Sequence, residues 1–184
     1  MSGTIGCMPI SMESEKRVLT LDDFLAMEAL ERSYYDPAYI APAAEAYAWY
    51  RAYPASTVAR FSEGGALLGF INLFPVQKAV FDALMNGTFN DSTLTVDDIA
   101  PAENASFLFL SCIAVAPEAR GRGLSEELLL EAVAQYRLSK NALLVTDNVT
   151  EAGARFSERI GLRFIKTSDH NSRIYAGEWE NVCK

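Results

Sequence analysis

Two arginines and two glycines at positions 120–123 are the residues of this chain best suited to chemistry with phosphate. They begin the run Arg120-Gly121-Arg122-Gly123-Leu124-Ser125. A glycine has no side chain to keep an anion away from the backbone N–H groups, and the arginines add positive charge. We therefore predict that a phosphate-containing ligand binds here, through Arg120, Gly121, Arg122, Gly123, Leu124 and Ser125.

The segments on both sides determine how this run folds. Phe107–Cys112 is a continuous apolar and aromatic segment, which is typical of a buried strand. Leu124–Lys140 has apolar residues at helical spacing and predicts a helix. A strand that leads through a glycine turn into a helix leaves the first N–H groups of the helix unpaired, at the positive end of its dipole. This arrangement favours anion binding.

Other phosphate sites and nucleic-acid binding fit the chain less well. The run lacks the Gly-Lys-Ser/Thr ending of a P-loop and the three-glycine spacing of a dinucleotide-binding fold. The chain carries a formal net charge of −8 and has no second basic cluster with interleaved aromatic residues, so we do not expect it to bind nucleic acid. A solvated basic turn is the remaining alternative.

The strand, the segment Val115-Ala116-Pro117-Glu118 and the pattern Arg120-x-x-Gly123-x-Ser125 resemble the acetyl-CoA motif of the GNAT acetyltransferase superfamily. That motif usually reads Arg/Gln-x-x-Gly-x-Gly/Ala. Ser125 departs from its last position, but serine is small, so a phosphate can still approach closely.

A second segment matches the same family at the expected distance along the chain. Ala142–Thr146 predicts a strand, and Ala154–Leu162 is similar to the helix of the family that ends in FYEKLGF. The resemblance extends over residues 17–178 and is sharpest over 106–166.

The resemblance implies an α/β fold, with a central mixed, mostly antiparallel sheet flanked by helices. It also implies that acetyl-CoA is the cosubstrate, that no metal is used, and that the acetyl group moves directly to an amine through a tetrahedral intermediate. The amine would belong to a small molecule or a peptide. The backbone of Ile113, Ala114 and Val115 would hold the pantetheine, and the turn at 120–125 the pyrophosphate. Thr150, at the start of the next helix, is a further candidate cofactor contact.

The proton acceptor of the family has no clear counterpart here. Family members often place a carboxylate on the strand before the acetyl-CoA motif, where this chain has Phe109, Ser111 and Cys112. Ser111 is no base, but it can hold a water molecule and is one candidate catalytic residue. The other candidates are Asp97, Asp98 and Glu103, if their segment folds over the site; otherwise they are solvated carboxylates.

The proton donor for the leaving thiolate also differs. The family uses the tyrosine of FYEKLGF, and this chain has Ser157 at that place. Ser157 is the second candidate catalytic residue; a water molecule or Tyr175 can take the same role, whereas Tyr136 is expected in the core. Because both family residues are missing, a non-catalytic acyl-CoA-binding or sensor module is the alternative function. A longer acyl group also stays open.

Composition indicates one globular domain, expected over 16–184, after a disordered leader at 1–15 that lacks the pattern of a secretory signal. The three cysteines suit a reducing cytoplasm, and no segment is long and apolar enough to cross a membrane. His170, the single histidine, is expected in an exposed loop. Residues 77–105 form an expected insertion, used for packing or a homodimer contact, or as a lid over the acceptor.

Periodicity predicts the remaining elements. Thr20 and Thr150 are predicted N-caps, and Gly161 is predicted to end a helix. Arg137 and Lys140 are expected in the last turn of the 124–140 helix. The predicted strands are 16–20, 58–61, 66–74, 162–166 and 173–179, and the predicted helices are 21–32, 41–53 and 150–160.

Acidic residues gather in the first two helical segments, at Asp22, Asp23, Glu28, Glu31 and Asp36. In the family these segments lie on the acceptor side, so the charge favours a cationic acceptor such as a polyamine, an aminoglycoside or a lysine side chain. An ordinary solvated face is the alternative.

Overall fold

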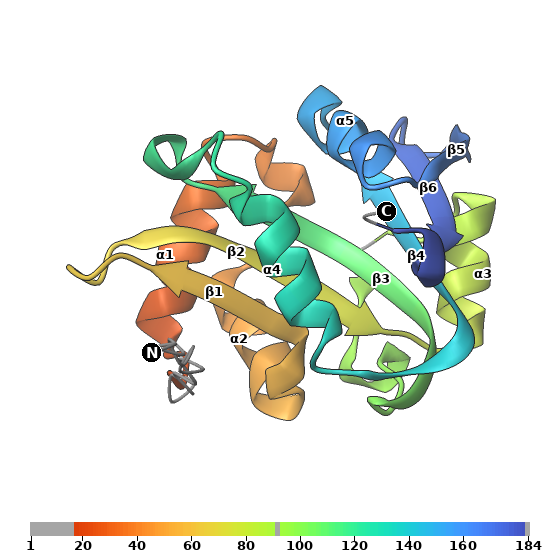
Figure 1. Cartoon of the computed structure of the whole chain (residues 1–184), viewed down its shortest axis with the longest axis horizontal. Helices are drawn as coiled ribbons and strands as arrows, with labels where there is room; N and C mark the ends of the chain where they lie inside the picture. The colour runs from red at the N-terminus through yellow and green to blue at the C-terminus, as the bar shows by residue number, and fades with distance from the viewer. Residues whose placement is uncertain (1–16, 91–92, 183–184) are drawn as a thin grey trace, which may run out of the picture.

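A mixed sheet of six strands forms the centre of the molecule (Figure 1). The structure is a computed structural model and describes residues 17–90 and 93–182. The order in the sheet is β1-β2-β3-β4-β6-β5, and only β3 and β4 run parallel to each other. The predicted mixed, mostly antiparallel sheet is therefore confirmed. The strands are β1 (Thr57–Phe61), β2 (Leu67–Pro75), β3 (Glu103–Val115), β4 (Arg137–Asn148), β5 (Arg163–Thr167) and β6 (Arg173–Glu178).

Helices cover both faces of this sheet: α1 (Leu21–Glu31), α2 (Ala43–Ala52), α3 (Lys78–Asn86), α4 (Leu124–Val133) and α5 (Glu151–Arg159). Figure 1 shows α4 in front of the sheet and α1 and α2 behind it. Successive side chains of β3 point to opposite faces of the sheet, so the strand contributes to the core on both sides. Leu108 and Leu110 join the core cluster of α4 and α5, whereas Phe107 and Phe109 join that of α2 and α3.

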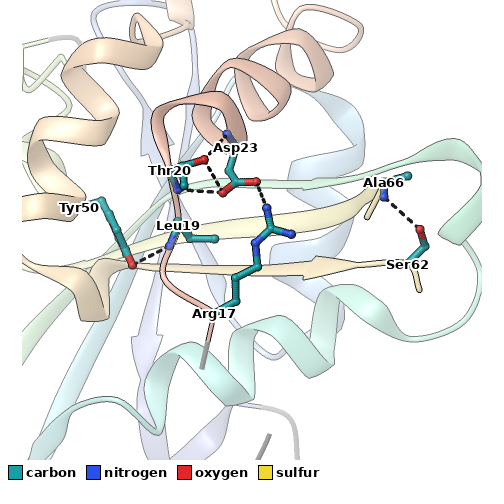
Figure 2. A network of polar contacts seen from close by, with 7 residues as sticks. All are labelled: Arg17, Leu19, Thr20, Asp23, Tyr50, Ser62 and Ala66. Atoms are coloured by element: carbon teal, nitrogen blue, oxygen red, sulfur yellow. Dashed lines mark hydrogen bonds and ion pairs between the residues drawn. The ribbon is translucent and has the colours of Figure 1, made fainter. Parts of the chain in front are cut away.

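The start of α1 is fixed by a dense group of polar contacts, drawn in Figure 2. Thr20 caps the helix, and its N–H donates to Oδ2 of Asp23 (2.8 Å) in a capping box. Arg17 forms an ion pair with Asp23, and the N–H of Leu19 donates to the hydroxyl of Tyr50 on α2 (3.1 Å). The predicted cap at Thr20 is confirmed, but the predicted strand is wrong for residues 17–20, which pair with no strand in the described chain.

The helix predicted over 124–140 is also too long. It ends at Val133, and β4 begins at Arg137. The N–H of Arg137 donates to the carbonyl of Ala102 (3.1 Å), and the buried hydroxyl of Tyr136 donates to the carbonyl of Leu73 (2.6 Å). Pairing with β3 thus overrides the helical pattern, so Arg137 and Lys140 lie on a strand. Tyr136 is in the core, as predicted.

The segment 77–105 holds α3, a 3-10 turn at Val96–Asp98 and the first residues of β3. Helix α3 packs on β3, β4 and β6 through Val80, Phe81 and Leu84, which are buried. This segment therefore covers part of the sheet. The leader expected at 1–15 lies outside the described residues. Among the described residues, no helix is long and apolar enough to span a membrane.

Candidate active site

The parallel strands β3 and β4 separate at one end, and a cavity opens between them. Their pairing ends at Leu110 and Thr146. Beyond this point β3 continues beside β2 only, and β4 beside β6 only. The cavity has a volume of about 290 Å³, and Ser111, Ile113 and Asp147 are among its lining residues. Beyond Leu110, the edge of β3 on the β4 side therefore has no neighbouring strand among the described residues.

Two tyrosines of the α1–α2 connection occupy this edge. The hydroxyl of Tyr35 donates to the carbonyl of Ile113 (3.2 Å), and that of Tyr34 donates to the carbonyl of Val115 (3.1 Å). Of the backbone predicted to hold the pantetheine, Ile113 lines this cavity, and Val115 lines a second cavity at the 120–125 turn. Ala114, between them, is buried and pairs with Phe70 of β2.

The glycine turn lies at the end of β3, as the sequence predicts. Gly121 and Gly123 have φ values of 71° and 78°, a left-handed conformation that favours glycine. A Cβ at either position would meet no atom within 4 Å, so the backbone there is open. A second cavity of about 280 Å³ is lined by Val115, Ala119, Arg120, Gly121, Gly123, Leu124, Ser125, Glu126 and Arg159. Arg122 is exposed and does not line it.

The side chain of Arg120, in the glycine turn, contacts the segment between α1 and α2. Its guanidinium lies over the ring of Tyr34, 4.5 Å from the centroid, and its Nε donates to the carbonyl of Val115 (3.4 Å). Arg120 is itself exposed. The turn and the edge of β3 thus form one continuous surface.

A carboxylate that the sequence analysis did not consider lies in the first cavity. Asp147 follows Thr146 on β4, and its Oδ1 is buried without a hydrogen-bond partner among the described residues. Burial raises the pKa of Asp147, against a hydrogen bond from Ser172 and the charge of His170. A half-buried carboxyl at a cavity, with one unused acceptor atom, is suited to taking a proton from a ligand. The sequence feature that could have singled out Asp147 is its position, as an acidic residue directly after the apolar strand predicted at 142–146.

Of the other residues predicted to be catalytic, only some lie at the first cavity. Ser111 lines the cavity. Ser157 is fully buried and does not line it; its Oγ accepts a hydrogen bond from Asn148 (2.9 Å), which does. Asp97, Asp98 and Glu103 are absent from the lining residues, and the hydroxyl of Tyr175 donates to Glu158 (2.9 Å). The segment 77–105 instead contributes Phe89 and Asn90 to the lining.

Thr150 lines the cavity and caps α5, because its hydroxyl accepts from the N–H of Gly153 (3.0 Å). The predicted cap is confirmed. Gly161 ends the helical segment with a φ of 95°, also as predicted. Within residues 17–90 and 93–182, no group of three or more His, Cys, Asp or Glu side chains is arranged to hold a metal ion.

Replacing Ser157 by alanine is expected to lower kcat by less than the roughly 10²–10⁴-fold typical of a dominant general acid. Ser157 does not line the cavity, and the change removes only its hydrogen bond to Asn148. The measurement is kcat on the first amine that shows turnover. A loss of several orders of magnitude with intact CoA binding would give Ser157 a principal catalytic role.

The sequence model of the Acetyltransferase (GNAT) family matches residues 24–162, which include the cleft strands and the glycine turn. The chain belongs to this family. No curated protein sequence matches the chain.

Solved structures agree with this GNAT assignment at the level of the fold. The GphF GNAT-like decarboxylase in complex with isobutyryl-CoA has a TM-score of 0.61 at 16% identity, covering 88% of this chain and 97% of its own. The loading GNATL domain of CurA from Lyngbya majuscula has a TM-score of 0.62 at 15% identity, covering 88% and 96%. The phosphinothricin acetyltransferase from Sinorhizobium meliloti, in complex with AcCoA, has a TM-score of 0.53 at 14% identity, covering 88% and 86%.

Proposed function

We propose that this GNAT protein is an N-acetyltransferase that moves an acetyl group from acetyl-CoA directly to an amine. The observation that carries the proposal is the half-buried carboxylate of Asp147, which lines the cavity between β3 and β4 and whose buried Oδ1 has no partner in the described chain. A module that only binds acyl-CoA has no use for such a group, and burying it costs stability. Asp147 therefore favours catalysis over the non-catalytic alternative.

The cosubstrate is proposed to lie along one surface. The pyrophosphate would bind the open backbone of the 120–125 turn, and the pantetheine would follow β3 at Ile113 and Val115, along the edge that has no neighbouring strand in the described chain. The family membership and the glycine conformations support this placement. The hydroxyls of Tyr34 and Tyr35 now occupy the two carbonyls, so the pantetheine must share or replace those contacts.

Asp147 is proposed to remove the proton that keeps the acceptor amine unreactive. An alkyl amine with a pKa of roughly 10.4 is neutral in about 1 part in 2,500 at pH 7, equivalent to about 4.6 kcal/mol. Asp147 takes one proton from the ammonium group, and the neutral nitrogen then attacks the thioester carbonyl. When the tetrahedral intermediate collapses, the C–S bond breaks and the CoA thiolate leaves. A second proton from the nitrogen then passes to this thiolate and gives the CoA thiol. A thiol with a pKa near 8.5 leaves without strong assistance.

A cationic acceptor fits the charges around the cavity. Its described lining includes the carboxylates Glu28, Glu31 and Asp147 and the imidazole of His170, but no lysine or arginine. Glu28 already accepts from Arg32 (2.6 Å) and from the N–H of Ala43 (2.7 Å), and these contacts lower its pKa. An anionic acceptor would have no positive partner of this kind in the cavity.

Binding of CoA is expected to stabilise the fold. At a free concentration 100-fold above Kd, the gain is about 2.7 kcal/mol, which corresponds to a rise in Tm of about 5–10 °C for a chain of this size. Thermal melts with and without millimolar CoA measure it. If another phosphate ligand raised Tm and CoA did not, the assignment of the turn to CoA would be wrong.

Turnover is tested by incubating the chain with acetyl-CoA and a panel of amines, and following both the CoA thiol and the mass of the amine. The proposal predicts thiol release that depends on the amine, together with an amine heavier by one acetyl group. Reactions without amine are the control for hydrolysis. Binding of acetyl-CoA with neither hydrolysis nor acetylation would support the non-catalytic alternative.

A further inference from the structure

The turn between β5 and β6 is held rigidly at the rim of the first cavity. Oγ of Ser168 accepts hydrogen bonds from the N–H groups of His170 (3.1 Å) and Ser172 (3.2 Å), and the two serine hydroxyls also bond each other. The N–H of Asp169 donates to the carbonyl of Gly87 after α3 (2.9 Å). Ser168 and Ser172 are both buried. The turn is therefore fixed both by its own hydrogen bonds and by a contact with the end of α3.

His170 stands between the cavity and solvent. It lines the cavity and is exposed, as predicted from the sequence. From the opposite side of the cleft, the hydroxyl of Tyr39 reaches the carbonyl of His170 (3.5 Å). Ser172 of the same turn lines the cavity as well, and both Ser172 and the charge of His170 oppose the rise in the pKa of Asp147. The turn therefore carries groups that face both the cavity of Asp147 and the surface.

We propose that His170 is the proton outlet for Asp147: it accepts the proton that Asp147 has taken from the amine and passes it to solvent. The inference rests on the proposed function and extends it by a positioning and relay residue. One proton moves from the ammonium nitrogen to the Asp147 carboxylate, then to a ring nitrogen of His170, and finally to water. Asp147 and His170 are then both restored for the next turnover.

The relay answers a requirement of the catalytic cycle. A proton that Asp147 has taken from the amine must leave the cavity before the next turnover, and histidine is the side chain that exchanges protons readily near neutral pH. The other groups fit the role less well. Burial raises the pKa of Tyr35 well above its ordinary value, and Glu28 is engaged by Arg32 and Ala43. The titratable residues that face the cavity with Asp147 are Glu28, Glu31, Tyr35, Tyr39, Cys112 and His170.

The first test replaces His170 by alanine and measures kcat with and without added imidazole. We expect kcat to fall by about 10–100-fold, less than for a group that meets the substrate directly, with the KM for acetyl-CoA unchanged. Free imidazole should restore much of the loss, because a small base can enter the vacated place. Asp169→Asn is the matched control: it alters an exposed side chain of the same turn and should leave kcat unchanged. Full activity in His170→Ala, or a loss that imidazole does not restore, would overturn the relay.

The second test does not depend on turnover. The chain has a single histidine, so one NMR signal reports on its imidazole without ambiguity. As pH is varied, that signal should show an inflection caused by ionisation of Asp147, and the inflection should be absent in Asp147→Asn. An identical titration curve in both proteins would overturn the pairing. Wild-type protein that binds acetyl-CoA but acetylates no amine would overturn the proposed function and the relay with it. Normal turnover by both the wild type and His170→Ala would overturn the relay alone.

Discussion

Replacing Asp147 by asparagine is expected to lower kcat by about 10²–10⁴-fold, the range for loss of a general base, while the Kd for CoA stays the same. The amide keeps the shape of the side chain but cannot take the proton of the amine. The measurement is kcat on an accepted amine, with Kd from calorimetry. Asp97→Asn is the matched control, because Asp97 is an exposed acid that does not line the cavity. Equal losses in both variants would remove Asp147 from the mechanism.

The same residue should set the acidic limb of the pH profile. Burial raises the pKa of Asp147, so kcat/KM should fall as pH drops through a value above the roughly 3.9 of an unperturbed aspartate. The acidic limb should be lost from the residual activity of Asp147→Asn. An unchanged profile in the variant would assign the limb to another group facing the cavity.

Stability should change in the opposite direction to activity. Because burial raises the pKa of Asp147, the folded chain binds this proton more tightly than the unfolded chain. The resulting stabilisation is complete below the unfolded pKa and is lost as pH rises through the folded pKa. At pH 7 the ionised carboxylate is therefore a cost, and Asp147→Asn should melt at a higher temperature than the wild type. A lower Tm at pH 7 would mean that the carboxylate is stabilised in a way that its contacts do not show.

Replacing Gly123 by valine is expected to weaken CoA binding by at least about tenfold. A branched side chain at a φ of 78° is strained by about 1–2 kcal/mol, roughly a factor of ten in an equilibrium. The chain can relieve the strain only by changing the turn that would hold the pyrophosphate, and the new side chain also blocks the backbone. Calorimetric titration with CoA measures the effect.

Two variants isolate the cause of that loss. Gly65→Val introduces a similar strain, at a φ of 82° in the β1–β2 turn, away from both cavities. It should lower Tm without changing the Kd for CoA. Arg122→Ala removes a charge from an exposed residue outside the cavity lining and should have only a small effect. If Gly123→Val bound CoA as well as Gly65→Val does, the turn would be an ordinary surface loop.

The parts of the fold that the sequence predicts correctly depend on local patterns. Gly121 and Gly123 follow an apolar strand, Thr150 precedes a helix and Gly161 ends it, and each of these signals acts within a few residues. The helix after Gly123 was predicted too long because its apolar pattern continues to Tyr136. Its true end depends on pairing between β3 and β4, which the local pattern does not contain.

The cavity could not be predicted in the same way, because contacts between distant segments build it. Tyr34 and Val115 are 81 positions apart, and Tyr39 and His170 are 131 apart. Asp147 lines the cavity because the pairing of β3 and β4 ends at the residue before it. The motif resemblance pointed to the glycine turn at 120–125 as the proposed cosubstrate site. It also pointed to Ser157, by alignment with a tyrosine, but the structure places that serine behind Asn148 rather than in the cavity lining.

A crystal structure of the chain with CoA tests the account most directly, through the distance from the CoA sulfur to the carboxylate of Asp147. The account predicts that the pyrophosphate lies on the backbone N–H groups of residues 120–125. It also predicts that the sulfur lies in the cavity between β3 and β4, with room for one amine nitrogen between it and Asp147. A sulfur that lies outside this cavity, or a cosubstrate bound away from the 120–125 turn, would contradict it.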